Sequence, residues 1–433
     1  MNSELIGMNL ISIKTRRPGK HPIIGRRMIV PRMSTVGSEA LSAAFRSIGI
    51  DAAVAPHSDD ASRALAGRFT TGEECLPQRI TLADFFKAMS ETDFDPDGYA
   101  FFMPTSAGPC RFGQYANFMR KVLRELGHDN ALVFSPTSTD QYEGIAQHIT
   151  RFKLTAWRAV VTSDALRKLT YLFRPYEANP GDADRVGGEI LSKLCGILSD
   201  GKSSSAKQLR LLTDIFEEAR DGMLRIPLKE EMGTRPLIGL VGEIFIRFNS
   251  ESNQHLVRRI EAMGGEVWMA DVSEWIWYTN AERERRLRES GKTLGPGMAA
   301  VKIRSWIQRR DEHANLAPLK SLFAGRKETP VETLLEYSRP YLPREKAMGE
   351  MTLNAGKVFA FHKAGCDGVV DASPFTCMNG IVTEAVYPRI SSDCGGMPVR
   401  IFYFDGVPVD LESGLEIFME LAKGYKRKKV RRI

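Results

Sequence analysis

The chain has 433 residues, of which 43% are hydrophobic and 26% charged, and its formal net charge is +7. This length predicts two domains with substantial cores, and the composition is ordinary for a globular protein. No apolar run approaches the roughly 18 residues that a membrane-spanning helix needs, so we expect no transmembrane segment.

Positive charge is concentrated at the two ends of the sequence. Residues 1–27 carry six Lys or Arg and one Glu, and residues 426–432 carry six Lys or Arg, so the rest of the chain is net negative. The first segment lacks the continuous apolar stretch of a secretory signal, so we expect a cytoplasmic chain whose six cysteines are thiols or metal ligands. We interpret the basic tail as a solvated run, because no nucleic-acid-binding motif accompanies it. Binding to nucleic acid or to an acidic partner is the alternative.

The first part of the sequence alternates short apolar strands with helices. Strands are expected at 28–31, 52–55, 99–103 and 131–134, and helices at about 37–48 and 111–126. This alternation is typical of βαβ units and a parallel sheet. Residues from about 141 to 232 favour helices, with polar breaks near 179–181 and 201–203.

A second α/β stretch begins near residue 236. Strands are expected at 237–242, 266–269, 368–371 and 399–404, with a charged helical insertion at about 281–364. The layout predicts an α/β protein with two parallel-sheet domains. We divide it into a basic N-terminal arm (1–27), a first α/β domain (28–140), a helical segment (141–235), a second α/β domain (236–423) and the basic tail (424–433).

Three of the six cysteines share one local setting, a loop containing Gly or Pro that leads into a helix. Cys75 lies in Thr-Gly-Glu-Glu-Cys-Leu-Pro, whereas Cys110 and Cys377 each follow an expected strand and a Pro-containing loop. A thiol at a helix N-terminus meets the positive end of the helix dipole, which lowers its pKa and favours the metal-binding thiolate. The pattern therefore predicts a soft-metal site.

The predicted sheets give these cysteines a common location. Ligands of open parallel sheets bind beyond the carboxyl ends of the strands, so we expect the site in the cleft between the domains. Three thiolates can hold a 4Fe–4S cluster with one iron left open, or zinc with a fourth ligand, and inert buried thiols are the alternative. Cys195 lies on an apolar helix face and is expected in the core. Cys366 and Cys394 lack the loop-into-helix pattern and are not expected to be ligands.

Two glycine-containing strings resemble nucleotide-binding motifs but lack the structural context. Residues 196–203 match GxxxxGK[ST], but a helical pattern precedes them where a phosphate loop requires a strand. Residues 239–243 lack the third glycine of a dinucleotide fingerprint. Glu243 and Arg247, which follow that strand, are expected either to line the cleft or to form a structural ion pair.

Four strings occur together in this order: TGEECLP at 71–77, GPCRFGQY at 108–115, VGEIFIRFN at 241–249 and PFTCM at 374–378. Together they resemble the 2-hydroxyacyl-CoA dehydratase superfamily. The closest resemblance is to the module that follows the ATPase domains in large CoA-substrate-specific enzyme activases. It covers roughly residues 26–423, and GPCRFGQY is its most specific part.

The resemblance implies two flavodoxin- or Rossmann-like domains that hold a 4Fe–4S cluster, or alternatively a double-cubane cluster. By motif position, the ligands are Cys75, Cys110 and Cys377. The residues expected along the cleft as cofactor contacts are Arg111, Gln114, Glu243 and Arg247. In the dehydratases, a partner ATPase injects a low-potential electron, and radical chemistry then removes water from an acyl-CoA.

The sequence lacks the ATPase domains of the large activases, so an ATP-driven step would need a separate protein. We therefore expect an iron–sulfur protein that takes part in low-potential electron transfer with an ATPase activator, as a homo- or hetero-dimer. An acyl-CoA dehydratase or double-cubane reductase subunit is the second hypothesis, and a non-catalytic cluster scaffold is the third.

Overall fold

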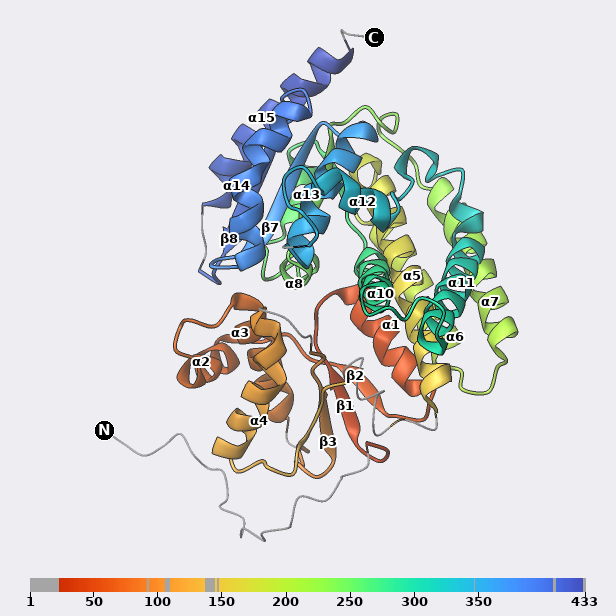
Figure 1. Cartoon of the computed structure of the whole chain (residues 1–433), viewed down its shortest axis with the longest axis vertical. Coiled ribbons are helices and arrows are strands. Elements are labelled where there is room, and N and C mark those ends of the chain that lie inside the picture. The colour runs from red at the N-terminus through yellow and green to blue at the C-terminus, as the bar shows by residue number, and fades with distance from the viewer. Residues whose placement is uncertain are drawn as a thin grey trace.

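The computed structural model describes residues 23–430, except 92, 106–109, 137–144, 146–147, 346 and 408–409 (Figure 1). Its strands form two four-stranded sheets, and every strand pair within these sheets is parallel. Helices flank both sheets. The predicted α/β class with two parallel sheets is therefore confirmed.

The first sheet has the strand order β2-β1-β3-β4. Its strands are β1 (Arg27–Val30), β2 (Ala52–Val54), β3 (Tyr99–Phe102) and β4 (Leu132–Phe134). Successive residues of a strand point to opposite faces, so Met28 and Val30 enter one core while Ile29 enters another. Because both faces are largely covered, these strands are mostly apolar, and Arg27 at the start of β1 is their one charged residue.

Helices cover both faces of the first sheet. They are α1 (Thr35–Arg46), α2 (Asp60–Phe69), α3 (Leu76–Met89), η1 (Arg111–Gln114) and α4 (Tyr115–Glu125). The helix α1 packs on the face of Met28 and Val30, and α3 and α4 pack on the face of Ile29.

The helical segment that follows shares a core with the first sheet. Its helices are α5 (Ile149–Phe173), η3 (Arg174–Tyr176), α6 (Asp182–Ser199) and α7 (Ser205–Leu224). Leu169 of α5, Leu194 of α6 and Phe216 of α7 belong to the same apolar cluster as Phe45 of α1. This segment therefore extends the first domain and covers α1.

The second sheet has the strand order β6-β5-β7-β8. Its strands are β5 (Leu237–Gly242), β6 (Glu266–Met269), β7 (Gly368–Pro374) and β8 (Val399–Phe404). The accompanying helices are α8 (Ile244–Phe248), α9 (Leu256–Ala262), α10 (Val272–Glu289), α11 (Pro296–Leu316), η4 (Ala317–Leu319), η5 (Ala324–Arg326), α12 (Val331–Ser338), α13 (Glu350–Lys363), α14 (Met378–Asp393) and α15 (Leu411–Val430). The helices α10 to α13 lie between β6 and β7, and they begin at Val272, about nine residues before the insertion expected at about 281–364.

The beginning of α3 joins the two domains. Leu76 belongs to a first-domain helix, yet it is only 4% exposed and lies in the same apolar cluster as Phe404 and Leu411 of the second domain. The Asn249 side chain also donates a hydrogen bond to the Arg32 carbonyl at 2.7 Å. Figure 1 shows α3 beside the loops at one end of the second sheet. This packing brings the Cys75 loop to the second domain.

The predicted strands agree with the structure. The ends of some elements differ from their predicted positions for local reasons. The helix α1 begins before the predicted residue 37, because the Ser34 hydroxyl caps it by accepting a hydrogen bond from the Gly37 amide. Residues 1–22 of the predicted basic arm and residues 431–433 of the basic tail lie outside the described residues. Within α15, Lys429 pairs with the buried Asp367, so the tail is not simply a solvated run. None of the described helices is long and apolar enough to cross a membrane.

Candidate functional site

Each of the three predicted ligand cysteines precedes the first residue of a helix. Cys75 is the N-cap residue of α3, Cys110 of η1 and Cys377 of α14. Cysteine is not among the residues that favour this position, which are Ser, Thr, Asp, Asn and Gly. Helix capping alone therefore does not account for three cysteines at equivalent positions.

Arg111 connects the three cysteine loops. Its Nη1 atom donates a hydrogen bond to the Glu73 carbonyl at 2.5 Å and lies 3.5 Å from the Thr376 hydroxyl oxygen. Arg111 is adjacent to Cys110, Glu73 is two residues before Cys75, and Thr376 directly precedes the third cysteine. The structure thus brings together loops that are up to about 300 residues apart in the sequence.

The backbone turns sharply just before Cys377. Thr376 has a φ of +63°, in the left-handed region that β-branched residues rarely adopt. Such strain persists only where the surroundings enforce it, and it is frequent at functional sites. The amide of Phe375 is held by the Phe404 carbonyl of β8, so the end of the sheet fixes this turn.

Cys75 has a direct polar partner at the start of α4. Its Sγ atom lies 2.5 Å from the hydroxyl oxygen of Tyr115, in a contact where either atom could donate the hydrogen. Tyr115 is the first residue of α4 and is only 6% exposed. Burial raises the pKa of Tyr115 well above its ordinary value, so the hydroxyl keeps its proton.

Two carboxyl groups of the second domain lie near the thiols. The Glu243 carboxylate caps α8 by accepting a hydrogen bond from the Ile246 amide at 2.9 Å, and the Glu350 carboxylate accepts one from the Ile244 amide at 2.8 Å. Burial raises both pKa values, and the charge of Glu243 contributes to raising that of Glu350 to about 8. The positive charge of Arg247 acts in the opposite direction on both groups.

The expected lowering of the thiol pKa values is wrong for the protein without a bound metal. Burial raises the pKa of Cys75, Cys110 and Cys377, the last to about 12, and the charge of Glu243 raises all three further. The amide groups in the first turn of each helix oppose this rise but do not overcome it. The shared influence of Glu243 places this carboxylate within electrostatic range of all three cysteines.

The other predicted cofactor contacts occupy different positions. Arg247 is buried, donates to the Gly242 carbonyl at 3.3 Å and lies over the ring of Phe248. Gln114 is exposed, and its side-chain oxygen accepts a hydrogen bond from Asn117 at 3.3 Å. The structure therefore gives Gln114 a surface contact within its own helical segment.

The remaining cysteines are packed with apolar side chains. Cys195 lies on α6 and packs against the core of the first domain. Cys366 and Cys394 are both 0% exposed and belong to an apolar cluster of the second domain. Their surroundings are those of structural thiols.

The phosphate-loop match at 196–203 begins within α6 and ends before α7, as predicted. The donors that a phosphate would need are already bound by Asp200. Its carboxylate accepts hydrogen bonds from the Lys202 amide at 2.8 Å and from the Ser203 hydroxyl at 2.5 Å. This string is therefore a turn between helices.

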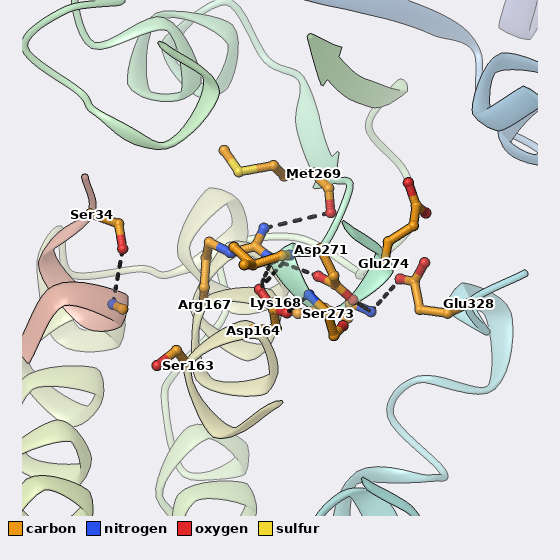
Figure 2. Close-up of polar contacts among 12 residues, drawn as sticks. Ser34, Ser163, Asp164, Arg167, Lys168, Met269, Asp271, Ser273, Glu274 and Glu328 are labelled. Atoms are coloured by element: carbon orange, nitrogen blue, oxygen red, sulfur yellow. Dashed lines mark hydrogen bonds and ion pairs between the residues drawn. The ribbon is translucent and has the colours of Figure 1, made fainter. Parts of the chain in front are cut away.

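A second polar cluster, which the sequence analysis missed, lies where α5 meets the end of β6. Figure 2 shows Arg167 and Lys168 of α5 directed toward Asp271, which precedes α10. Arg167 lies 2.5 Å from one carboxylate oxygen of Asp271, and Lys168 lies 2.9 Å from the other. The Glu328 carboxylate forms ion pairs with both Lys168 and Lys357. Lys357 also forms an ion pair with Glu274, at 2.7 Å.

These charges form ion pairs between helices that are distant in the sequence. The network therefore has a structural role, because it connects those helices. The local signal was the spacing of Asp164, Arg167 and Lys168, three charged residues within one face of α5 among apolar neighbours such as Leu166 and Leu169. Glu350 lies outside the four motif strings, so no local pattern pointed to it, and Tyr115 is the last residue of GPCRFGQY.

Within the described part of the chain, no three His, Cys, Asp or Glu side chains are grouped as ligands of one metal ion. The contacts of Arg111 with Glu73 and Thr376 link the loops that carry the three cysteines. No family model matches the chain, and no curated protein matches it either.

Proposed function

We propose that the protein is an iron–sulfur protein whose cluster is bound by Cys75, Cys110 and Cys377 where the two α/β domains meet. The observation that carries this proposal is the Arg111 side chain, which contacts the two other cysteine loops from its position beside Cys110. Cysteine thiolates are the usual protein ligands of iron–sulfur clusters.

Three features of the thiols' surroundings support this proposal. Each thiol lies at a helix start, where amide groups favour negative charge, and Tyr115 adds a hydroxyl beside Cys75. Leu76, buried among apolar side chains of the second domain, holds the Cys75 loop against that domain. A four-iron cluster held by three cysteines supplies one-electron chemistry and leaves one iron for an external ligand.

The resemblance to the 2-hydroxyacyl-CoA dehydratase superfamily suggests how such a protein would be used. We infer that it receives low-potential electrons from a separate ATP-hydrolysing activator. An acyl-CoA dehydratase is the second candidate. It is favoured by Glu243 and Glu350, whose charges act on Cys110 and Cys377, because dehydration needs groups that move protons.

Anaerobic purification, followed by iron and sulfide analysis, tests the cluster directly. We expect about four irons per chain with matching sulfide. A preparation that holds only zinc after anaerobic reconstitution with iron and sulfide would contradict the proposal. ATP-dependent reduction by an activator and turnover of a 2-hydroxyacyl-CoA then separate the electron mediator from the dehydratase.

A further inference from the structure

We propose that Tyr115 is a positioning residue that donates a hydrogen bond to the ligand sulfur of Cys75 and thereby raises the reduction potential of the bound cluster. This inference rests on the proposed function, since it concerns the same thiol. It adds a residue that is not a ligand but acts on one.

The position of Tyr115 leaves its hydroxyl facing the thiol. The side chain is 6% exposed, and its hydroxyl, at the start of α4, contacts Sγ of Cys75, the N-cap residue of α3. The ring also packs edge-on against Phe112, with 5.3 Å between the ring centroids. Because Tyr115 lies five residues after Cys110, one short segment supplies both a second thiol and the hydroxyl that touches the first.

Coordination of Cys75 to iron would fix the direction of this hydrogen bond. A thiol can either donate to a phenol or accept from it, whereas a coordinated thiolate has no hydrogen to donate. The Tyr115 hydroxyl is then the donor and Cys75 Sγ the acceptor. Metal ligands are commonly oriented by such outer partners.

The donated hydrogen bond has a predictable effect on electron uptake. Reduction by one electron increases the negative charge shared by the iron-bound sulfurs, so a donor stabilises the reduced form more than the oxidised form. Hydrogen bonds to sulfur are among the factors that set the potentials of these clusters. Removal of the hydroxyl should therefore make the potential more negative.

The test compares Tyr115→Phe with Tyr403→Phe in anaerobically reconstituted full-length protein. Tyr403 is a matched control, because its hydroxyl lies in the same domain as Cys377 but donates to Glu384 at 2.8 Å. Both proteins are titrated with titanium(III) citrate, in which each titanium(III) gives one electron and becomes titanium(IV), and the reduced state is followed by electron paramagnetic resonance. We expect full iron content in both variants and a negative shift of the potential only for Tyr115→Phe.

Each other outcome overturns the inference in a recognisable way. An unchanged potential at full iron content would leave Tyr115 with a packing role only. Loss of iron from a folded Tyr115→Phe protein, checked by circular dichroism, would show that the hydroxyl retains the cluster and does not tune it. Wild-type protein without iron would overturn the proposed function together with this inference.

Discussion

At the scale of single residues, the three site thiols are under opposing influences. Helix starts favour their thiolate forms, while burial and the charge of Glu243 favour the protonated thiols. A bound metal must therefore displace protons from all three cysteines, so metal uptake is coupled to pH. We expect cluster assembly to be slower at lower pH.

Single cysteine substitutions separate ligands from structural thiols. Replacing Cys75, Cys110 or Cys377 by Ala leaves two thiolates, so iron content and visible absorbance should fall to a small fraction of the wild-type values. The matched controls are Cys195→Ala and Cys394→Ala, which remove thiols packed among apolar side chains. They should keep the iron and cost about 1 kcal/mol of stability from lost packing.

Iron analysis of these variants, prepared in parallel, checks the assignment, and Cys366→Ala should behave like the other controls. A cluster that survives Cys110→Ala, or one that is lost with Cys394→Ala, would show that the ligand set is wrong.

At the scale of elements, α3 carries a buried acid as well as the Cys75 loop. Asp84 is 2% exposed, accepts a hydrogen bond from the Ser58 amide at 2.9 Å, and has its pKa raised to about 7 by burial. The folded protein therefore binds this proton more tightly than the unfolded chain. Its contribution to stability is present below about pH 4 and is lost as the pH rises toward 7.

Asp84→Asn should remove this pH dependence while keeping an oxygen that accepts from Ser58. We expect the variant to gain stability relative to wild type between pH 4 and 7, by at most about 1.4 kcal/mol per pH unit. Urea unfolding at several pH values measures the difference. The control is Asp51→Asn, a change at an exposed position. Parallel pH profiles for Asp84→Asn and wild type would contradict the raised pKa.

The elements themselves were largely predictable. Most of the described parallel strands are short apolar runs, so they could be located from the local sequence pattern. The run at β7 extends three residues beyond the predicted end, to Pro374, because its last residues pair with β8. Helix starts were less accurate, since a cap such as Ser34 depends on the geometry of one side chain.

At the scale of the whole molecule, buried charges connect the helical segment to the second domain. Lys357 of α13 is 2% exposed at its side chain and pairs with Glu274 of α10 and with Glu328. Glu328 also pairs with Lys168 of α5. Removing one member of such a buried network leaves charge without compensation.

Lys357→Met should therefore destabilise the protein by about 3–5 kcal/mol, measured by chemical unfolding. Lys193→Met is the matched control, because the ion pair between Lys193 and Glu218 is about half exposed (50% and 47%). It should cost no more than about 1 kcal/mol. Adding Glu274→Gln to Lys357→Met should restore part of the loss. Equal losses of stability for the two lysine substitutions would argue against a structural role for the buried ion-pair network.

The sequence by itself determined the α/β class, the positions of the strands and the three cysteine loops. These features depend on side-chain periodicity and on turn residues within about ten positions of one another. Only the tertiary structure decided that Arg111 contacts the Thr376 loop, that Glu350 lies near the thiols and that their pKa values are raised. Burial and charge pairing depend on elements that are distant in the sequence, and local patterns do not encode which of these elements meet.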